Sequence, residues 1–174
     1  MATDGRSEAI IETSVLVNFL KIDRIDLLAL HPAYRFIAVD LVRDEVTKRY
    51  ATQLDRLNAA FAATHLLPDI LPETVSLAEL AVFAAMEKLR IGQGERASIA
   101  AANARGLPLG MDDERAWKRA AAFCVVIPRE NTVSLMVTLI KAGVIDITGA
   151  DAIKADWEAN HKFKLPFHSF AQRI

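Results

Sequence analysis

The feature that most constrains the fold of this chain is an alternation of short apolar runs with longer segments of helical periodicity. The short runs are bounded by turn or helix signals, as expected for strands buried on both faces of a parallel sheet. They lie at residues 9–12, 35–39, 107–111 and 124–128. Helical spacing of apolar residues is found at 14–21, 24–30, 41–50, 51–66, 76–90, 95–105, 113–123, 131–143 and 150–163. Strands alternating with helices predict an α/β fold with a mainly parallel sheet.

Length and composition predict one domain without membrane attachment. The chain has 174 residues, enough for one proper core and too few for two ordinary ones, so residues 1–174 are expected to form a single domain. Hydrophobic residues make up 52%, yet no stretch of about 18 uncharged apolar residues exists to span a membrane. Residues 1–8 lack the pattern of a signal peptide, and the lone Cys124 excludes a disulfide within the chain. A cytoplasmic protein is therefore expected.

The net charge of −1 provides no global basic field that would attract nucleic acid. A nucleic-acid partner would have to be held by a local basic patch or through metal ions. The apolar richness of the chain is also compatible with a surface that is buried against another chain.

Acidic residues stand where ligands bind in sheets of this kind, beyond the carboxyl ends of the strands. Glu12 ends the first predicted strand, and Asp112 and Asp113 end the third. Glu45 and Glu95 lie in predicted helices, where helical periodicity places each beside the buried apolar stripe. An ionised carboxylate in such a position is costly unless a cation or a metal ion pairs with it.

Convergence of these carboxylates on one cleft would predict a metal site. Carboxylates that converge repel one another and raise each other's pKa unless a divalent ion neutralises them. Mg²⁺ and Mn²⁺ are the natural partners of an all-oxygen site. Ions held in this way activate water and stabilise the charge that develops in phosphodiester cleavage.

Each acid also has a local explanation, in which it starts a helix or pairs with a nearby base. The alternatives are a cap at Thr13 or Ser14 with Glu12 beside it, a cap at Asp112, a helix start at Gly94 and Glu95, and an ion pair between Glu45 and Arg49. Spacing alone leaves these alternatives open. A shared site is favoured because all four places lie at one end of one predicted sheet.

Taken in order, these motifs resemble the PIN domain family, specifically the VapC-like toxins and their single-domain relatives. The resemblance covers nearly the whole chain and depends on order and spacing rather than on any one motif. It rests on Ile11-Glu12-Thr13-Ser14, Glu45, Gly92-Gln93-Gly94-Glu95, Asp112-Asp113-Glu114-Arg115 and Lys141-Ala142-Gly143-Val144-Ile145. The fold that it implies is a three-layer α/β/α sandwich with a short, mainly parallel sheet of four to five strands.

The resemblance also implies an activity, the metal-dependent cleavage of RNA by a metal-activated water that leaves a 5′-phosphate and a 3′-hydroxyl. The catalytic residues that it implies are Glu12, Glu95 and Asp112. The implied ligands of Mg²⁺ or Mn²⁺ are Glu12, Glu45, Glu95 and Asp112, with Asp113 accessory. Ser14 would support the first acid by hydrogen bonding, and whether Glu95 or Asp112 orients the water stays open.

Partners are expected on the same grounds. Arg96 and Arg115 adjoin the implied ligands and are expected to contact RNA phosphates. The tail at 161–170 mixes basic and aromatic residues, which either stack on RNA bases or pack on the domain. In the family, the region that corresponds to 51–90 forms dimer contacts and a groove for an antitoxin helix, so a homodimer and a small antitoxin protein are expected.

Two departures from the family pattern affect the expected activity. The family usually has Asp where this chain has Glu12, which is longer by one C–C bond, about 1.5 Å. Mg²⁺ prefers near-ideal octahedral geometry at about 2.0–2.1 Å, so the site must adjust or weaken. After the fourth strand, family members often carry Gly-Thr, whereas this chain has Arg129-Glu130 and then Thr132. The alternative function is a catalytically weakened PIN-like module that binds RNA or a protein partner.

Overall fold

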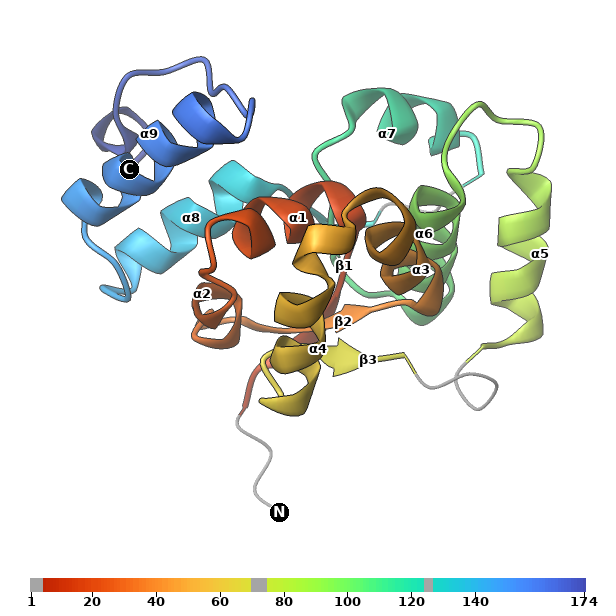
Figure 1. The fold of residues 1–174 in the computed structure, drawn as a ribbon. Coiled ribbons are helices and arrows are strands. Elements are labelled where there is room, and N and C mark those ends of the chain that lie inside the picture. Colours follow the sequence, from red (N-terminus) through yellow and green to blue (C-terminus); the bar gives the residue numbers. More distant parts are fainter. Residues whose placement is uncertain (1–4, 70–74, 124–126) are drawn as a thin grey trace.

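A five-stranded sheet with the order β3–β2–β1–β4–β5 forms the centre of the molecule, and every pair of neighbouring strands is parallel. The computed structural model describes residues 5–69, 75–123 and 127–174. The strands are β1 (Ser7–Ile11), β2 (Tyr34–Ala38), β3 (Leu67–Pro68), β4 (Leu109–Gly110) and β5 (Arg129–Glu130). Helices flank this sheet (Figure 1), which confirms the predicted α/β class and is consistent with a PIN-like fold.

The two edge strands differ from the expectation. β3 was not predicted, because two residues that include a proline carry no strand pattern. At the edge of a sheet the missing N–H of Pro68 costs no ladder hydrogen bond, so β3 can pair with Ile37 and Ala38. The strand expected at 124–128 falls largely outside the described residues, and β5 follows directly after it.

Each predicted helical segment contains a helix. The described helices are α1 (Thr13–Lys21), α2 (Asp26–Ala29), α3 (Asp40–Arg49), α4 (Leu54–Ala62), α5 (Leu77–Ala85), α6 (Gln93–Arg105), α7 (Glu114–Ala120), α8 (Thr132–Lys141) and α9 (Ile147–Asn160), with 3-10 turns η1 (Ala51–Gln53) and η2 (Phe170–Gln172). Within the described residues, no helix combines the length and apolar character that crossing a membrane requires.

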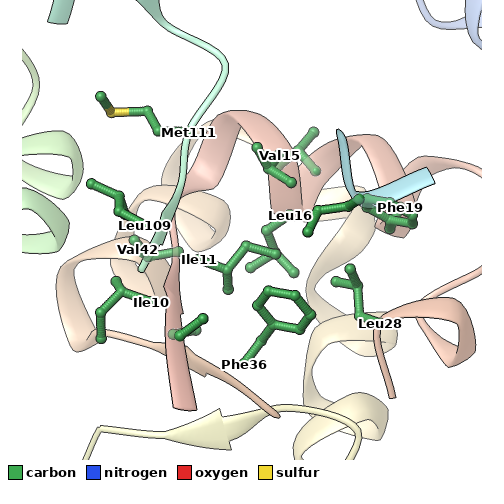
Figure 2. Packing of buried hydrophobic residues seen from close by; sticks show 14 of the residues in the cluster. Ile10, Ile11, Val15, Leu16, Phe19, Leu28, Phe36, Val42, Leu109 and Met111 are labelled. Atoms are coloured by element: carbon green, nitrogen blue, oxygen red, sulfur yellow. The ribbon is translucent and has the colours of Figure 1, made fainter. Parts of the chain in front are cut away.

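β1 is the centre of the core because both faces of the sheet are covered there. Ile10 and Ile11 are fully buried, and their side chains leave the strand on opposite faces (Figure 2). Ile11 is directed toward Leu16 and Phe36, whereas Ile10 lies on the side of Leu109. Burial on both faces explains why this strand is a continuous apolar run instead of an alternating one.

The strand order creates a topological switch point between β1 and β4. From β1 the chain adds β2 and β3 on one side, and it then returns to add β4 and β5 on the other side. The residues that follow β1 and β4 are consequently neighbours: the Glu12 N–H donates to the Gly110 carbonyl at 2.9 Å. In open parallel sheets, this edge is where ligands bind.

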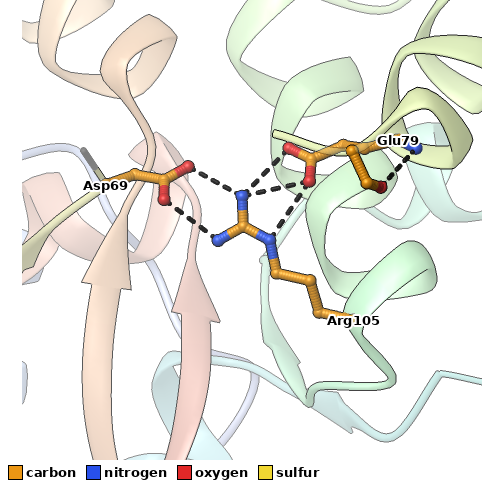
Figure 3. Close-up of polar contacts among 4 residues, drawn as sticks. Asp69, Glu79 and Arg105 are labelled. Atoms are coloured by element: carbon orange, nitrogen blue, oxygen red, sulfur yellow. Dashed lines mark hydrogen bonds and ion pairs between the residues drawn. The ribbon is translucent and has the colours of Figure 1, made fainter. Parts of the chain in front are cut away.

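Helix α5 packs against the domain through a buried acidic side chain, while two of its leucine side chains are exposed to solvent. Glu79 is buried, where Arg105 of α6 donates to it and also makes a bidentate contact with Asp69, with N–O distances of 3.0 and 2.9 Å (Figure 3). In contrast, Leu77 is 86% exposed and Leu80 is 52% exposed. The outward face of α5 is therefore an apolar surface that the described chain leaves uncovered.

Candidate active site

Glu12 stands directly after β1, and it is itself the cap of α1. Its Oε2 accepts hydrogen bonds from the Ser14 backbone N–H at 2.8 Å and from the Ser14 hydroxyl at 2.5 Å. The helix begins at Thr13, so the cap is Glu12 and neither of the two hydroxyl residues considered from the sequence. A carboxylate in this position also lies at the positive end of the helix dipole.

The Glu12 carboxyl is almost completely buried, with 2% of the residue exposed. Burial raises its pKa to about 7; the Ser14 hydrogen bonds oppose this rise, and the negative charges of Glu95 and Glu45 add to it. A side chain that ends the central strand at the switch point therefore sits among other acids without a cationic partner in the described residues. Carboxylates perturbed in this way are concentrated at functional sites.

Ser14 joins the first acid to the acid after β4. Its hydroxyl donates to Glu12 and accepts from the Asp112 backbone N–H at 3.0 Å. The Asp112 carboxylate is held on its other side, because Oδ1 accepts from the Thr132 N–H at 2.9 Å and Oδ2 accepts from the Thr132 hydroxyl at 2.6 Å and from Asn18 at 3.0 Å. Burial raises the pKa of Asp112, and these hydrogen bonds oppose the rise. The side chain is thus fixed in one orientation.

Asn18, which donates to Asp112, is not among the residues predicted from the sequence. It lies on α1 four residues after Ser14, so helical periodicity places the two on one face. It also donates to the Thr132 hydroxyl at 3.1 Å. A polar residue one turn after Ser14 inside an apolar helix was the signal that could have identified it.

Glu45 reaches the site from α3. Its Oε2 accepts from the Thr13 hydroxyl at 3.0 Å, and its Oε1 accepts from Arg49 at 2.6 Å, which is the local pair considered from the sequence. Gly94 allows α6 to approach this close, because a Cβ there would lie 2.5 Å from Glu45 Oε2. A larger residue at that position would displace the Glu45 carboxylate from its present place.

Glu95 and Asp113 complete the acidic group. Glu95 Oε2 accepts from the Gly92 N–H at 2.6 Å, as in an ordinary helix start. Asp113, and not Asp112, caps α7, since its Oδ1 accepts from the N–H groups of Arg115 and Ala116 at 2.7 and 3.0 Å. Burial raises the pKa of Glu95, and the nearby charges of Asp113 and Glu45 add to the rise.

The donor chemistry of this group suits a hard divalent cation, because every predicted ligand offers carboxylate oxygen. The acids also lie close enough to interact electrostatically: the charges of Glu95 and Glu45 raise the pKa of Glu12, and those of Asp113 and Glu45 raise the pKa of Glu95. In the described part of the chain, however, no three His, Cys, Asp or Glu side chains are gathered into a ready metal-binding group. The oxygens are turned toward helix caps and hydrogen-bond donors, so a bound ion would compete with those contacts.

The two arginines expected at the RNA lie in different places. Arg115 lines a cleft beside Asp112 and Asp113. Arg96 packs over the Phe83 ring of α5, with 4.5 Å between its guanidinium carbon and the ring centroid. Arg96 is therefore engaged with α5, and its contact with RNA phosphates stays a prediction, as does that of Arg115.

The charged pair that departs from the family pattern has a packing role. Arg129 lies over the Trp117 ring at 4.3 Å from its centroid. Glu130 accepts hydrogen bonds from Ser134 at 2.5 Å and from Tyr34 at 3.3 Å. These contacts hold β5 and the start of α8, and α8 carries Thr132 to Asp112.

Comparison with known proteins adds one structural likeness. No protein-family model matches the chain, and no curated protein matches it significantly. Among solved structures, it is similar to the crystal structure of VapBC2 from Rickettsia felis bound to a DNA fragment from their promoter, with 15% identity and a TM-score of 0.49. The match covers 71% of this chain and 98% of that chain. A likeness of this size identifies neither family nor function, which have to be argued from the site.

Proposed function

We propose that this chain is a metal-dependent ribonuclease of the PIN type, resembling the VapC-like toxins. The observation that carries the proposal is the buried Glu12 at the β1–β4 switch point, with a pKa raised to about 7 in the company of Glu45 and Glu95. A buried acid perturbed by other acids is costly for folding. Its placement at the ligand-binding edge of a parallel sheet favours a functional role over a structural one.

The proposed ligands of Mg²⁺ or Mn²⁺ are Glu12, Glu45, Glu95 and Asp112, with Asp113 accessory. Such an ion would supply activation of water and stabilisation of negative charge on the phosphate. The chain's own contribution is orientation. Ser14 holds Glu12, and Thr132 and Asn18 hold Asp112. The acids that follow β1 and β4 are thus fixed in orientation.

We assign the attacking water to Glu95 in preference to Asp112. Both oxygens of Asp112 already accept hydrogen bonds from Thr132, whereas Glu95 uses Oε2 for the Gly92 N–H. Oε1 of Glu95 would hold the water and receive its proton as the phosphodiester is cleaved to a 5′-phosphate and a 3′-hydroxyl. A raised pKa suits this role, because a general base works best when its pKa lies near the working pH.

The proposal includes protein partners, namely a second copy of the chain and a small antitoxin. It is supported by the exposed apolar face of α5, where Leu77 and Leu80 point outward while Glu79 is buried. This helix lies in the region that the family resemblance assigns to such contacts. Exposed apolar surface of this kind is typical of a protein–protein interface. A cytoplasmic location remains part of the same proposal.

The test is RNA cleavage by the purified protein with Mn²⁺. Asp112→Asn is expected to abolish cleavage while circular dichroism and the melting temperature stay near those of the wild type. Asp44→Asn is the matched control, since Asp44 is an exposed acid beside Glu45 on α3. Cleavage that survives in clean Asp112→Asn, or that is lost equally in Asp44→Asn, would overturn the mechanism.

A second candidate is a PIN-like module that binds RNA or a protein partner and has lost catalysis. The observation that favours it is the use of Glu12 Oε2 as a helix cap, with both Ser14 donors bound to one oxygen. Calorimetric titration with Mn²⁺ separates the two candidates. Absence of binding in the wild type, together with binding in Glu12→Asp, would support the inactive module.

A further inference from the structure

A cleft opens beside the acids, and two aromatic side chains, Tyr50 and Phe163, are part of its lining. It is lined by residues of α1, the end of α3, the start of α7 and the segment after α9: Ser14, Val17, Asn18, Lys21, Tyr50, Asp112, Asp113, Glu114, Arg115 and Phe163. Its volume is about 520 Å³, and it continues from the candidate active site through Ser14, Asp112 and Asp113.

The aromatic side chains of this cleft are held in place by neighbouring elements. The Phe163 ring packs edge-on against Trp157 at 5.4 Å between centroids, and Trp157 donates to the Asn18 carbonyl of α1 at 2.8 Å. The chain reverses at Lys162, whose φ of +55° is unusual for a residue other than glycine. This reversal returns Phe163 to α9 beside the cleft. Phe163 therefore packs on the domain, as one of the two expectations for the tail had it, and the same ring also lines the cleft.

A lysine ammonium group lies over the ring of Tyr50, the second aromatic residue of the cleft. Lys21 Nζ lies 5.3 Å from the centroid of Tyr50, and both residues are only partly buried. Arg115 also lines the cleft and is exposed, and no ion pair of its guanidinium is found within the described residues. The cleft thus combines flat apolar faces with two cations in its lining.

The charges of the lining determine what can enter. Asp112, Asp113 and Glu114 are acidic, so a phosphate beside them would be repelled unless a metal ion lay there. A neutral base with an apolar face meets no such repulsion. The two cations, Lys21 and Arg115, are in reach of the phosphates that flank such a base.

We propose that this cleft is a nucleotide-binding subsite that takes an unpaired base of single-stranded RNA against Phe163 and Tyr50, with Lys21 and Arg115 contacting the adjoining phosphates. The proposal rests on the proposed nuclease function for the identity of the nucleic acid. It adds the selection of substrate: a paired base keeps its faces stacked in the duplex and cannot enter the cleft. Aromatic stacking platforms with basic rims are the usual means of binding single strands without strict sequence preference.

The experiment measures binding without cleavage. A short unstructured RNA that carries one 2-aminopurine is titrated with the protein in EDTA and again in Ca²⁺, and both anisotropy and 2-aminopurine fluorescence are followed. The wild type is expected to bind the single strand, to quench the fluorescence through stacking, and to bind the corresponding duplex more weakly. Phe163→Leu is expected to lose about tenfold in affinity together with the quenching.

The matched control is Phe167→Leu in the same tail. The Phe167 ring packs on Phe170 at 5.1 Å between centroids and does not line the cleft, so affinity and quenching should stay at wild-type values. Wild-type behaviour of Phe163→Leu, equal binding of duplex, or no binding of the single strand in either buffer would overturn the subsite. Binding with these properties but no cleavage in Mn²⁺ would instead refute the nuclease proposal and leave the subsite intact.

Discussion

Replacing Glu12 by Gln tests whether the buried acid at the end of β1 costs stability for the sake of function. Glutamine has nearly the same shape, and its amide oxygen can accept the two Ser14 hydrogen bonds that Oε2 accepts now. The substitution therefore keeps the helix cap and removes only the charge. In the absence of metal we expect Glu12→Gln to stabilise the protein at alkaline pH.

The expected size follows from the raised pKa. In the unfolded chain Glu12 ionises near 4.5, whereas in the folded protein its pKa is about 7. Below pH 4.5 the carboxyl is protonated in both states and costs nothing. As the pH rises from 4.5 to about 7 the wild type loses stability, because the unfolded state releases its proton while the folded state retains it, and the loss is complete above pH 7. A rise of this size corresponds to about 3 kcal/mol.

The assay is urea unfolding in EDTA between pH 4.5 and 8.5, followed by circular dichroism for wild type and Glu12→Gln. The difference in unfolding free energy is expected to grow by about 3 kcal/mol across this range in favour of the variant. Mn²⁺ should then stabilise the wild type at pH 8 far more than the variant. Two pH profiles that run parallel would refute the reasoning, since they would mean that Glu12 titrates normally or is compensated by a partner.

Three further substitutions test the surroundings of the site. Thr132→Val removes the hydroxyl donor to Asp112, so we expect a higher pKa of that acid, seen as a shift of the acidic limb of the pH–rate profile to higher pH, and a stability loss of about 1 kcal/mol. Gly94→Ala places a methyl group where it would displace the Glu45 carboxylate, so we expect weaker Mn²⁺ binding by calorimetry with little change in the melting temperature; unchanged Mn²⁺ affinity would contradict the close approach. Arg105→Met leaves two buried carboxylates without their cation and is expected to cost about 3 kcal/mol at pH 7, less in acid, with partial rescue by Arg105→Lys.

The central part of the fold was predictable because its signals are local. β1 and β2 are apolar runs buried on both sides, and α1 and α3 follow them with regular spacing. The short edge strand β3 was not predictable, since two residues containing Pro68 carry no strand pattern and are placed by pairing with β2. The burial of Glu79 in α5, with Leu77 and Leu80 exposed, was not predictable either. The sequence of this helix is apolar, and only Arg105 on another helix explains why Glu79 is the residue that is buried.

The sequence by itself determined which acids stand at strand ends and helix starts, because strand length and helical period are properties of neighbouring residues. Only the tertiary structure decided which of them share an environment and where their oxygens point. Glu12 is directed to Ser14 as a cap, Asp112 is held by Thr132 from 20 residues further along the chain, and Phe163 returns from the far end to line the same cleft. Those contacts join segments that are remote in sequence, and they arise from strand order and helix packing, which no local pattern encodes.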